Sequence, residues 1–195
     1  MAKKHEGPST RRGRGARERL LKAANELFYA QGVHTVGINQ VIEVAGVARG
    51  SLYKTFGSKD ALIEAYLEGR HASTLANLHA QLDSVADPKA RILAVFDVQA
   101  KAFAVAGFNG CAFIEATAEA PRGGVVERAA ERFRADIRRL FTDLAREVGA
   151  TDPVQLGRQL HILYDGGTFA ARMDGDPAIA ADSKAAAEHL LADIP

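Results

Sequence analysis

Apolar residues recur every three or four positions along most of the chain, and this spacing predicts helices. The expected helices cover about residues 16–31, 38–45, 59–85, 88–106, 111–119, 125–148, 153–172 and 177–192, with a further short segment around Leu52 and Phe56. No segment alternates apolar and polar residues persistently, as a half-buried strand does. The sequence therefore predicts an all-α protein of about nine helices.

Start and stop signals support these boundaries. Asp is a good N-cap and Pro fits the first helical position, and this pair occurs at Asp87-Pro88, Asp152-Pro153 and Asp176-Pro177. Ser58 is a second kind of N-cap. Gly166-Gly167 falls inside the expected helix 153–172, where each Gly costs about 1 kcal/mol relative to Ala. Either close packing against another helix or a kink would account for this pair.

The segment 37–56 has the pattern of two short helices joined by a glycine turn. Ile38, Val41, Ile42 and Ala45 share one helical face, Gly46 ends that helix, and Leu52 and Phe56 lie four apart in the next. The remaining positions of the second helix are long or polar: Arg49, Ser51, Tyr53, Lys54 and Thr55. A helix-turn-helix has this pattern, although the spacing alone also fits any small helical hairpin.

The run AGVARGSLYKTFGSKDALIEAYL resembles the DNA-binding domain of the TetR/AcrR family of transcriptional repressors. The match comprises Ala45, Gly46, Val47, Gly50, Leu52, Tyr53, Phe56, Lys59 and Leu62, with Ala24, Leu27, Phe28 and Gly32 upstream. The resemblance is specific over about residues 16–66. Three positions depart from the family pattern: Ala48 replaces a usual Ser, Thr55 replaces a frequent His, and Gly37 replaces a frequent Ser or Thr.

The resemblance implies a domain plan and a set of DNA contacts. A helix-turn-helix domain, residues 16–58, would be joined to a helical ligand-binding and dimerisation domain, residues 59–195. Arg49, Ser51 and Lys54 are expected at base edges or nearby phosphates, and Tyr53, Thr55 and Lys59 at phosphates. Gly50 would allow close approach of the backbone. The remaining residues expected to contact DNA are Gly37, Asn39 and Ala48.

Charge is distributed unevenly in a way that fits this plan. Residues 1–59 carry 11 Lys and Arg against 4 Asp and Glu, whereas the whole chain has a net charge of only +1. A basic first third favours a polyanionic partner for that part. Residues 1–15 are basic and rich in Gly, and we expect a disordered arm that either contacts DNA or is merely solvated.

The rest of the chain is expected to bind a small-molecule effector and to form a homodimer. A ligand enclosed by helices needs aromatic walls and a few polar groups. The candidates are Tyr66, Phe96, Gln99, Phe103, Asn109, Phe113, Glu115, Thr117, Phe133 and His161, each of which also suits an ordinary core. The helices 153–172 and 177–192 resemble the dimerisation element of the family. Leu156, Leu160, Leu163 and Tyr164 form an apolar stripe there, which packing within one chain would explain equally well.

Other classes of function lack their motifs. No nucleophile elbow, Walker loop or dinucleotide-binding glycine pattern occurs, and the histidines have no metal-ligand spacing, so we expect no enzyme activity, no metal and no cofactor. No apolar run is long enough for a membrane span, and we expect a cytoplasmic protein. Cys111 is the only cysteine, and a buried inert thiol is favoured over an oxidant sensor.

We therefore expect a ligand-responsive regulator that binds a palindromic operator, most simply a repressor. A transcriptional activator and a non-specific architectural DNA-binding protein remain alternatives. The sequence identifies neither the effector nor the operator.

Overall fold

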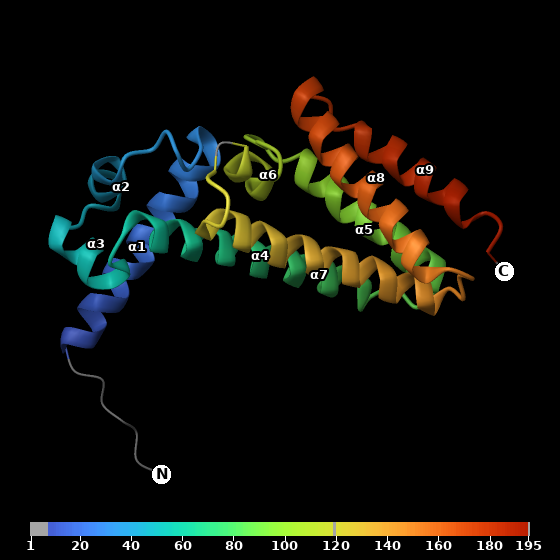
Figure 1. The fold of residues 1–195 in the computed structure, drawn as a ribbon, viewed down its shortest axis with the longest axis horizontal. Coiled ribbons are helices and arrows are strands. Elements are labelled where there is room, and N and C mark those ends of the chain that lie inside the picture. The colour runs from blue at the N-terminus through green and yellow to red at the C-terminus, as the bar shows by residue number, and fades with distance from the viewer. Residues whose placement is uncertain (1–7, 119, 195) are drawn as a thin grey trace, which may run out of the picture. The chain divides into compact units, whose positions relative to one another are not determined.

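The computed structural model describes residues 8–118 and 120–194, and within these ranges every regular element is a helix (Figure 1). The helices are α1 (Pro8–Gln31), α2 (Ile38–Ala45), α3 (Arg49–Phe56), α4 (Lys59–Leu82), α5 (Pro88–Phe103), α6 (Ala112–Thr117), α7 (Val125–Glu147), α8 (Pro153–Asp174) and α9 (Ile179–Leu191). The all-α prediction is confirmed. None of these helices has the length and apolarity that crossing a membrane requires.

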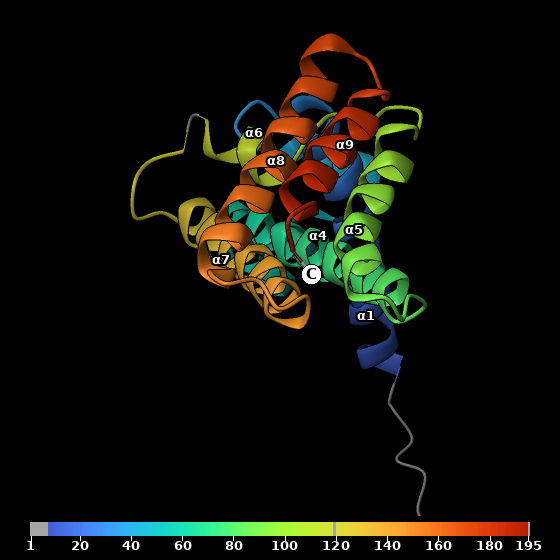
Figure 2. The ribbon, with the colours of Figure 1, turned by 90° about the vertical axis from the view of Figure 1, so that its right-hand side faces the viewer.

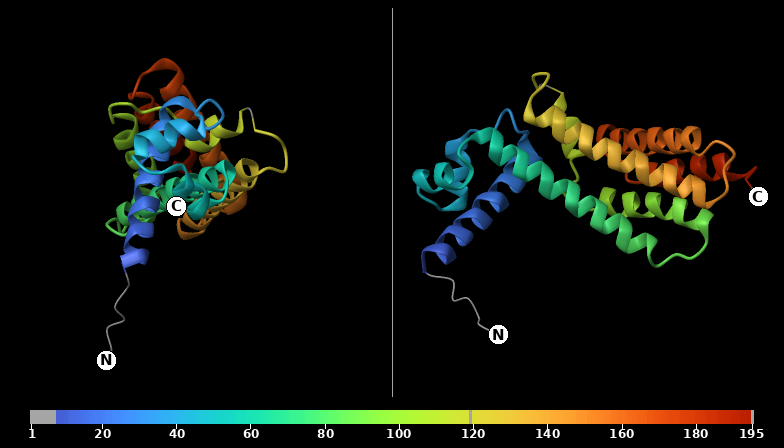
Figure 3. Two further views of the ribbon diagram at one scale, coloured as in Figure 1. Left: turned by 90° about the vertical axis from the view of Figure 1, so that its left-hand side faces the viewer. Right: turned by 60° about the horizontal axis from the view of Figure 1, so that its bottom comes forward.

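The chain forms two compact units, and the first contains α1 to α3. Unit 1 comprises the chain up to Gly69 together with Glu115–Ala129. In this unit α1 contacts both α2 and α3 (Figures 1 and 3). The side chains between them are fully or almost fully buried: Leu20, Ala24, Phe28, Val41 and Leu52. This apolar core fixes α3 with its other face outward.

The turn between α2 and α3 depends on one glycine. Gly46 has φ +60° and ψ 42°, a left-handed conformation that strains other residues. Its N–H donates to the Glu43 carbonyl at 3.1 Å, and the Val47 N–H donates to the Ile42 carbonyl at 3.3 Å. These bonds satisfy the last carbonyls of α2. The turn predicted from the sequence is thus present and sets the start of α3 at Arg49.

Unit 2 is a helical bundle formed by Arg70–Ile114 and the chain from Ala130 onward. In it α9 contacts both α5 and α8, and α5 contacts α8 (Figure 2). Fully buried members of its core include Phe96, Ile137, Phe141, Leu144 and Leu160. Two ion pairs at its surface also join separate helices: Lys184 to Asp97 at 2.7 Å, and Arg91 to Glu147 at 3.4 Å.

Two glycines allow neighbouring helices to approach α8 closely. A Cβ at Gly157 would lie 2.7–2.9 Å from Thr142 of α7, including its backbone, and a Cβ at Gly167 would lie 2.4 Å from the Ser183 Oγ of α9. Real Cβ atoms essentially never approach other atoms so closely. Of the two explanations offered for the Gly166-Gly167 pair, close packing therefore applies at Gly167, whereas Gly166 is exposed.

Helix starts agree with the sequence in part. The Asp87 carboxylate accepts the Ala90 N–H at 2.7 Å, and the Asp152 carboxylate accepts the N–H groups of Val154 and Gln155. Asp176 instead accepts the Ala178 N–H and caps a turn, so α9 begins at Ile179 rather than at Pro177. The reason is that tight turns at Pro177 and Ala178 precede the first helical residue.

The beginning of α1 also differs from the expectation. Helix α1 starts at Pro8, not near Ala16, so residues 8–15 of the expected disordered arm are helical. Proline is tolerated in a first turn because its missing N–H has no helical partner there, and Arg has a high helix propensity. Residues 1–7 lie outside the described residues.

The apolar stripe expected to mediate dimerisation lies inside unit 2. Leu156 and Leu160 are buried, and Leu163 and Tyr164 are half-buried. Helix α8 has a second apolar face that periodicity did not distinguish from the first. That outer face presents Ile162, Phe169 and Met173, which are 70%, 56% and 66% exposed.

Candidate nucleic-acid interface

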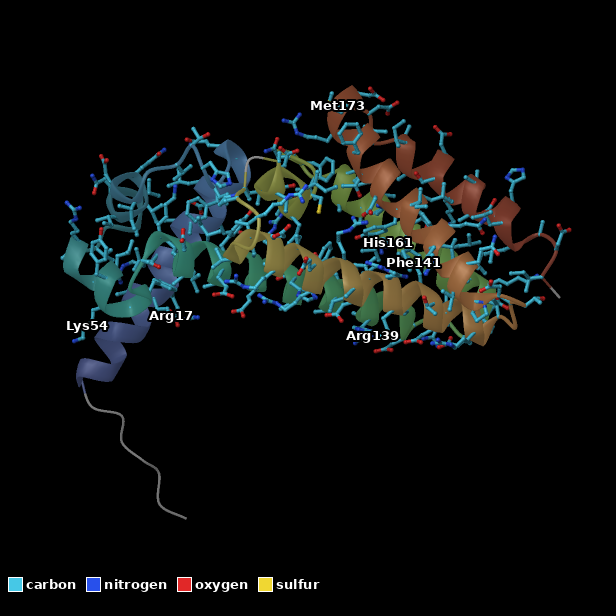
Figure 4. The ribbon with its side chains drawn as sticks, in the orientation of Figure 1. Arg17, Lys54, Arg139, Phe141, His161 and Met173 are labelled. Atoms are coloured by element: carbon cyan, nitrogen blue, oxygen red, sulfur yellow. The ribbon has the colours of Figure 1, made fainter. Side chains whose placement is uncertain are left out.

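The outward face of α3 presents three of the five long or polar residues expected there, together with Gly50. Leu52 is buried, whereas Arg49, Gly50, Tyr53 and Lys54 are exposed. Figure 4 shows Lys54 at the outer edge of unit 1. A short helix that is anchored by a buried apolar residue and has a polar outer face is free to enter a major groove.

Arginine side chains lie over aromatic rings at both ends of α3. The Arg49 guanidinium carbon is 5.9 Å from the centre of the Tyr53 ring, and that of Arg17 is 5.7 Å from the centre of the Phe56 ring. Such cation–π contacts hold a charged group in a limited set of orientations. Arg17 was not among the predicted DNA-side residues. Its membership of the basic stretch Arg11–Arg19 was a signal in the sequence that could have indicated it.

Two hydroxyl residues of α3 are less accessible than the sequence indicated. Ser51 and Thr55 are both half-buried. The Thr55 hydroxyl donates to the Ser51 carbonyl at 2.6 Å, so its proton is already engaged. Thr55 can therefore contribute an acceptor but not this proton, which weakens its assignment as a donor to phosphate.

The residues that precede the two helices have no side-chain capping bond. Gly37 and Ala48 are the N-caps of α2 and α3, with extended backbone at both positions. Gly37, Asn39 and Ala48 are exposed. The Ser51 N–H donates to the Ala48 carbonyl at 2.8 Å. The three predicted residues are thus accessible at the starts of α2 and α3, and their contact with DNA stays a prediction.

Lys59 begins α4 beside a well-formed cap. Ser58 Oγ accepts the Ala61 N–H at 3.1 Å, which confirms Ser58 as the N-cap. Lys59 is half-buried; desolvation lowers its pKa, and the neighbouring Asp60 carboxylate opposes that shift. An anion at this position would offset two unfavourable contributions: the desolvation of the Lys59 ammonium and the position of a cation at a helix N-terminus.

Gly50 has no role that the fold itself explains. A Cβ at Gly50 would meet nothing within 4 Å, and its φ is not in the left-handed region. We predict that Gly50→Ala stabilises the protein by about 0.5–1 kcal/mol, since Ala has the higher helix propensity, yet weakens operator binding. Thermal unfolding and fluorescence anisotropy check the two effects. A variant that gains stability without losing affinity would show that DNA does not approach this atom.

The ten candidate pocket residues are divided between the units. Tyr66 lies in unit 1, where its ring meets that of Phe28 edge-on at 5.5 Å. Glu115 and Thr117 also belong to unit 1, where the His34 Nε2 contacts the Ala116 carbonyl at 3.2 Å. These three residues therefore do not belong to the bundle that was expected to hold an effector. Helices α4 and α6 each contribute residues to both units, which periodicity alone does not show.

The other seven candidates lie in unit 2 in different surroundings. Phe103 is buried in a small cluster with Ala171 and Ala180, and Phe96 faces Phe141 at 6.1 Å. Phe113 and Phe133 stack at 4.2 Å, and both rings also face His71. Asn109 is half-buried. The remaining two are Gln99 and His161, which are both buried and polar.

Gln99 and His161 each retain a buried polar atom without a hydrogen-bond partner. The Gln99 Nε2 donates to the Tyr164 carbonyl at 2.6 Å and to Thr168 Oγ1 at 2.8 Å, but its Oε1 has no partner. The His161 Nε2 is likewise unsatisfied. Among the described residues, the other two buried atoms without a hydrogen bond are the His71 Nε2 and Arg91 Nε, and each lies near a carboxylate: Asp136 at 3.1 Å and Glu147 at 3.4 Å. A buried polar group with no partner at all costs about 1–3 kcal/mol.

Cys111 precedes α6 and is held in its neutral form. Burial raises the pKa of its thiol, and Asp165 raises it further, while the N–H groups of Ile114 and Phe113 and the charge of Arg134 lower it. We predict that iodoacetamide at pH 7.5 alkylates the native protein at least about tenfold more slowly than the denatured protein, because only the thiolate reacts. Mass spectrometry of the time course measures both rates. Equal rates would indicate a reactive, sensor-like thiol.

Comparison with known proteins gives consistent matches. Residues 20–66 match the family described as bacterial regulatory proteins, tetR family. A TetR-family transcriptional regulator from Streptomyces coelicolor is 34% identical, with a TM-score of 0.88 over 93% of this chain and 96% of that one. A TetR-type transcriptional regulator from Streptomyces avermitilis is 32% identical, with a TM-score of 0.82 over 92% and 97%.

Similarity to curated sequences is confined to shorter stretches. The HTH-type transcriptional regulator LmrA of Bacillus subtilis is 47% identical over 55 residues, which are 27% of this chain and 29% of that protein. An HTH-type transcriptional regulator of Mycobacterium tuberculosis is 32% identical over 85 residues, 44% of this chain and 42% of that protein. The chain thus matches less than half the length of these curated relatives.

Proposed function

The chain belongs to the TetR family of DNA-binding transcriptional regulators, and from this we propose that it is a homodimeric repressor released from its operator by a small molecule. Its outward-facing α3 carries this proposal. Arg49, Tyr53 and Lys54 are exposed there on a helix held in place by the buried Leu52. These side chains reach base edges and phosphates when such a helix lies in a major groove.

The outer face of α8 supports the proposal that the protein forms a homodimer. Ile162, Phe169 and Met173 recur at helical spacing and are more than half exposed, and Gly166 on the same face allows close approach. Exposed alanines of α9, Ala181 and Ala185, provide a second flat surface. An exposed apolar patch of this kind marks an interface. A symmetric dimer would bind half-sites one helical turn, or a multiple of it, apart.

The buried polar atoms of unit 2 that lack a hydrogen bond support the proposal that the protein binds a small-molecule effector. Three of them belong to Gln99, His161 and His71, within or beside the aromatic residues of the bundle. Buried polar atoms normally have partners, and a bound ligand would supply one to Gln99 and to His161, whereas the His71 Nε2 already lies 3.1 Å from the Asp136 carboxylate.

Fluorescence anisotropy with labelled duplexes tests the proposal. The promoter beside the protein's own gene is compared with random DNA of equal length at several salt concentrations. We expect the promoter to bind about 10³-fold or more tightly, with two protomers per site. Equal affinity for both duplexes, governed only by salt, would instead identify a non-specific architectural protein.

A further inference from the structure

Arg17 of α1 is an exposed arginine beside the C-terminal end of α3. Its guanidinium carbon lies 5.7 Å from the centre of the ring of Phe56, which is the last residue of α3. Ala16 and Leu20 on either side of Arg17 are buried in unit 1, so the backbone that carries Arg17 is held against the core. The residues matched to the tetR family begin at position 20, and that match therefore assigns no role to Arg17.

The charge of Arg17 has no counter-charge among the side chains that the structure describes. Arginines of unit 2 differ in this respect, because they pair with carboxylates: Arg134 with Asp165 at 2.5 Å, and Arg139 with Asp136 at 3.2 Å. A contact with an aromatic ring leaves most of the five N–H donors of a guanidinium available. Two of these donors match two oxygens of a phosphate group.

Further positive charge lies near the same end of α3. Lys54 is exposed in the last turn of α3, and Lys59, three residues after Phe56, begins α4. In Figure 4 both Arg17 and Lys54 lie toward the lower edge of unit 1. The C-terminal end of a helix carries a partial negative charge that repels phosphate. The cations offset this repulsion, so this end of α3 is able to attract a polyanion.

The width of the major groove decides which part of the DNA Arg17 meets. The groove is about 12 Å wide, and a helix with its side chains is about 10–12 Å across, so α3 alone fills it. A side chain from a neighbouring helix then meets the sugar–phosphate backbone at the edge of the groove. We propose that Arg17, positioned by the Phe56 ring, binds a backbone phosphate at the C-terminal end of α3. The inference rests on the insertion of α3 into DNA proposed above.

The salt dependence of operator binding tests this phosphate contact. Fluorescence anisotropy compares the wild type with Arg17→Gln on the promoter duplex and on duplexes with single base changes. We expect Arg17→Gln to bind about tenfold more weakly at 50 mM salt and about threefold more weakly at 200 mM, because one lost phosphate contact lowers the salt slope by about 0.9. Discrimination between the duplexes should be unchanged, since a phosphate carries no sequence information.

Arg19→Gln is the matched control. Arg19 is also exposed on α1, and two positions along a helix correspond to about 200° around its axis. The control therefore removes the same charge from a different side of α1 and should bind within about twofold of the wild type, because exposed charges beyond the contact are screened. Arg17→Lys should keep the salt slope and recover only part of the affinity, since lysine lacks the two-donor geometry.

Neutral methylphosphonate groups, placed singly along the promoter duplex, locate the phosphate. At one position the substitution should weaken binding of the wild type and have no further effect on Arg17→Gln, because the charge that contacts this phosphate is already absent. A merely structural contact between Arg17 and Phe56 would instead lower the thermal stability of Arg17→Gln and leave the salt slope unchanged.

Four outcomes would overturn the inference: an unchanged salt slope in Arg17→Gln, equal losses in Arg17→Gln and Arg19→Gln, a loss confined to one base pair, or additive losses at every methylphosphonate position. The wild-type protein separates this inference from the proposed function. Specific promoter binding by the wild type together with any of these outcomes refutes the Arg17 contact alone. A wild type that does not distinguish the promoter from random DNA refutes the proposed function.

Discussion

Replacing Phe169 with aspartate is expected to convert the protein to monomers and to lower operator affinity by about 100-fold or more. Phe169 is 56% exposed at the middle of the outer apolar face of α8, between Ile162 and Met173. Aromatic residues near the centre of an interface contribute about 2–4 kcal/mol each, and a buried unpaired carboxylate adds a desolvation cost. Analytical ultracentrifugation measures the dimer, and anisotropy with operator DNA measures the affinity.

Ala135→Asp is the matched control for this prediction. It places the same carboxylate at an exposed position of α7, where charged side chains already predominate. The control should remain dimeric and bind the operator normally. Thermal unfolding of both variants must stay close to that of the wild type, because both substitutions are at the surface. A dimeric Phe169→Asp protein would place the interface on another face.

The second large effect is expected at Arg49. Arg49→Ala should cost about 1–3 kcal/mol of operator binding and relax discrimination at one base pair, because a bidentate arginine contact specifies guanine. The side chain is exposed at the first position of α3. Its position over the Tyr53 ring reduces the entropy lost on binding. Anisotropy with operators changed singly at each position gives both the affinity and the discrimination.

Arg49→Lys separates charge from geometry. Lysine keeps the positive charge but cannot make the planar, two-donor contact. We therefore expect this variant to retain the salt dependence of binding and to lose most of the discrimination. If Arg49→Lys discriminates as the wild type does, Arg49 contacts a phosphate and not a base.

Local signals in the sequence predicted most of the helices, but they did not predict which helices and side chains contact one another. Asp87 and Asp152 cap their helices as expected, because capping depends on atoms within a few residues. The same holds for the Gly46 turn and the buried Leu52, which fix the outward face of α3. These short-range features explain why Arg49, Tyr53 and Lys54 are exposed as expected, and their contact with DNA stays a prediction.

Contacts between segments far apart in the sequence could not be predicted from the periodicity of apolar residues. Helix α8 is apolar on two faces, and only the tertiary structure shows that Leu160 is inside while Ile162 is outside. Tyr66 was expected to line an effector pocket, yet it completes the core of unit 1 against Phe28. Arg17 approaches α3 only because α1 packs across it. Each of these cases depends on which elements meet, and the hydrophobic pattern of one element does not determine its partner.

The two glycines of α8 also bear on which parts of the protein are able to move. Because Gly157 and Gly167 have no side chain, α8 packs closely against the backbone of α7 at the first and against α9 at the second. Rolling α8 about its own axis would drive atoms into one another at both positions, since closely packed interiors yield little. A subunit contact formed by the outer face of α8 would therefore involve a helix that is held rigidly within its own protomer. In the proposed dimer we therefore expect the two protomers to stay associated during release from DNA, with the rearrangement located in other helices.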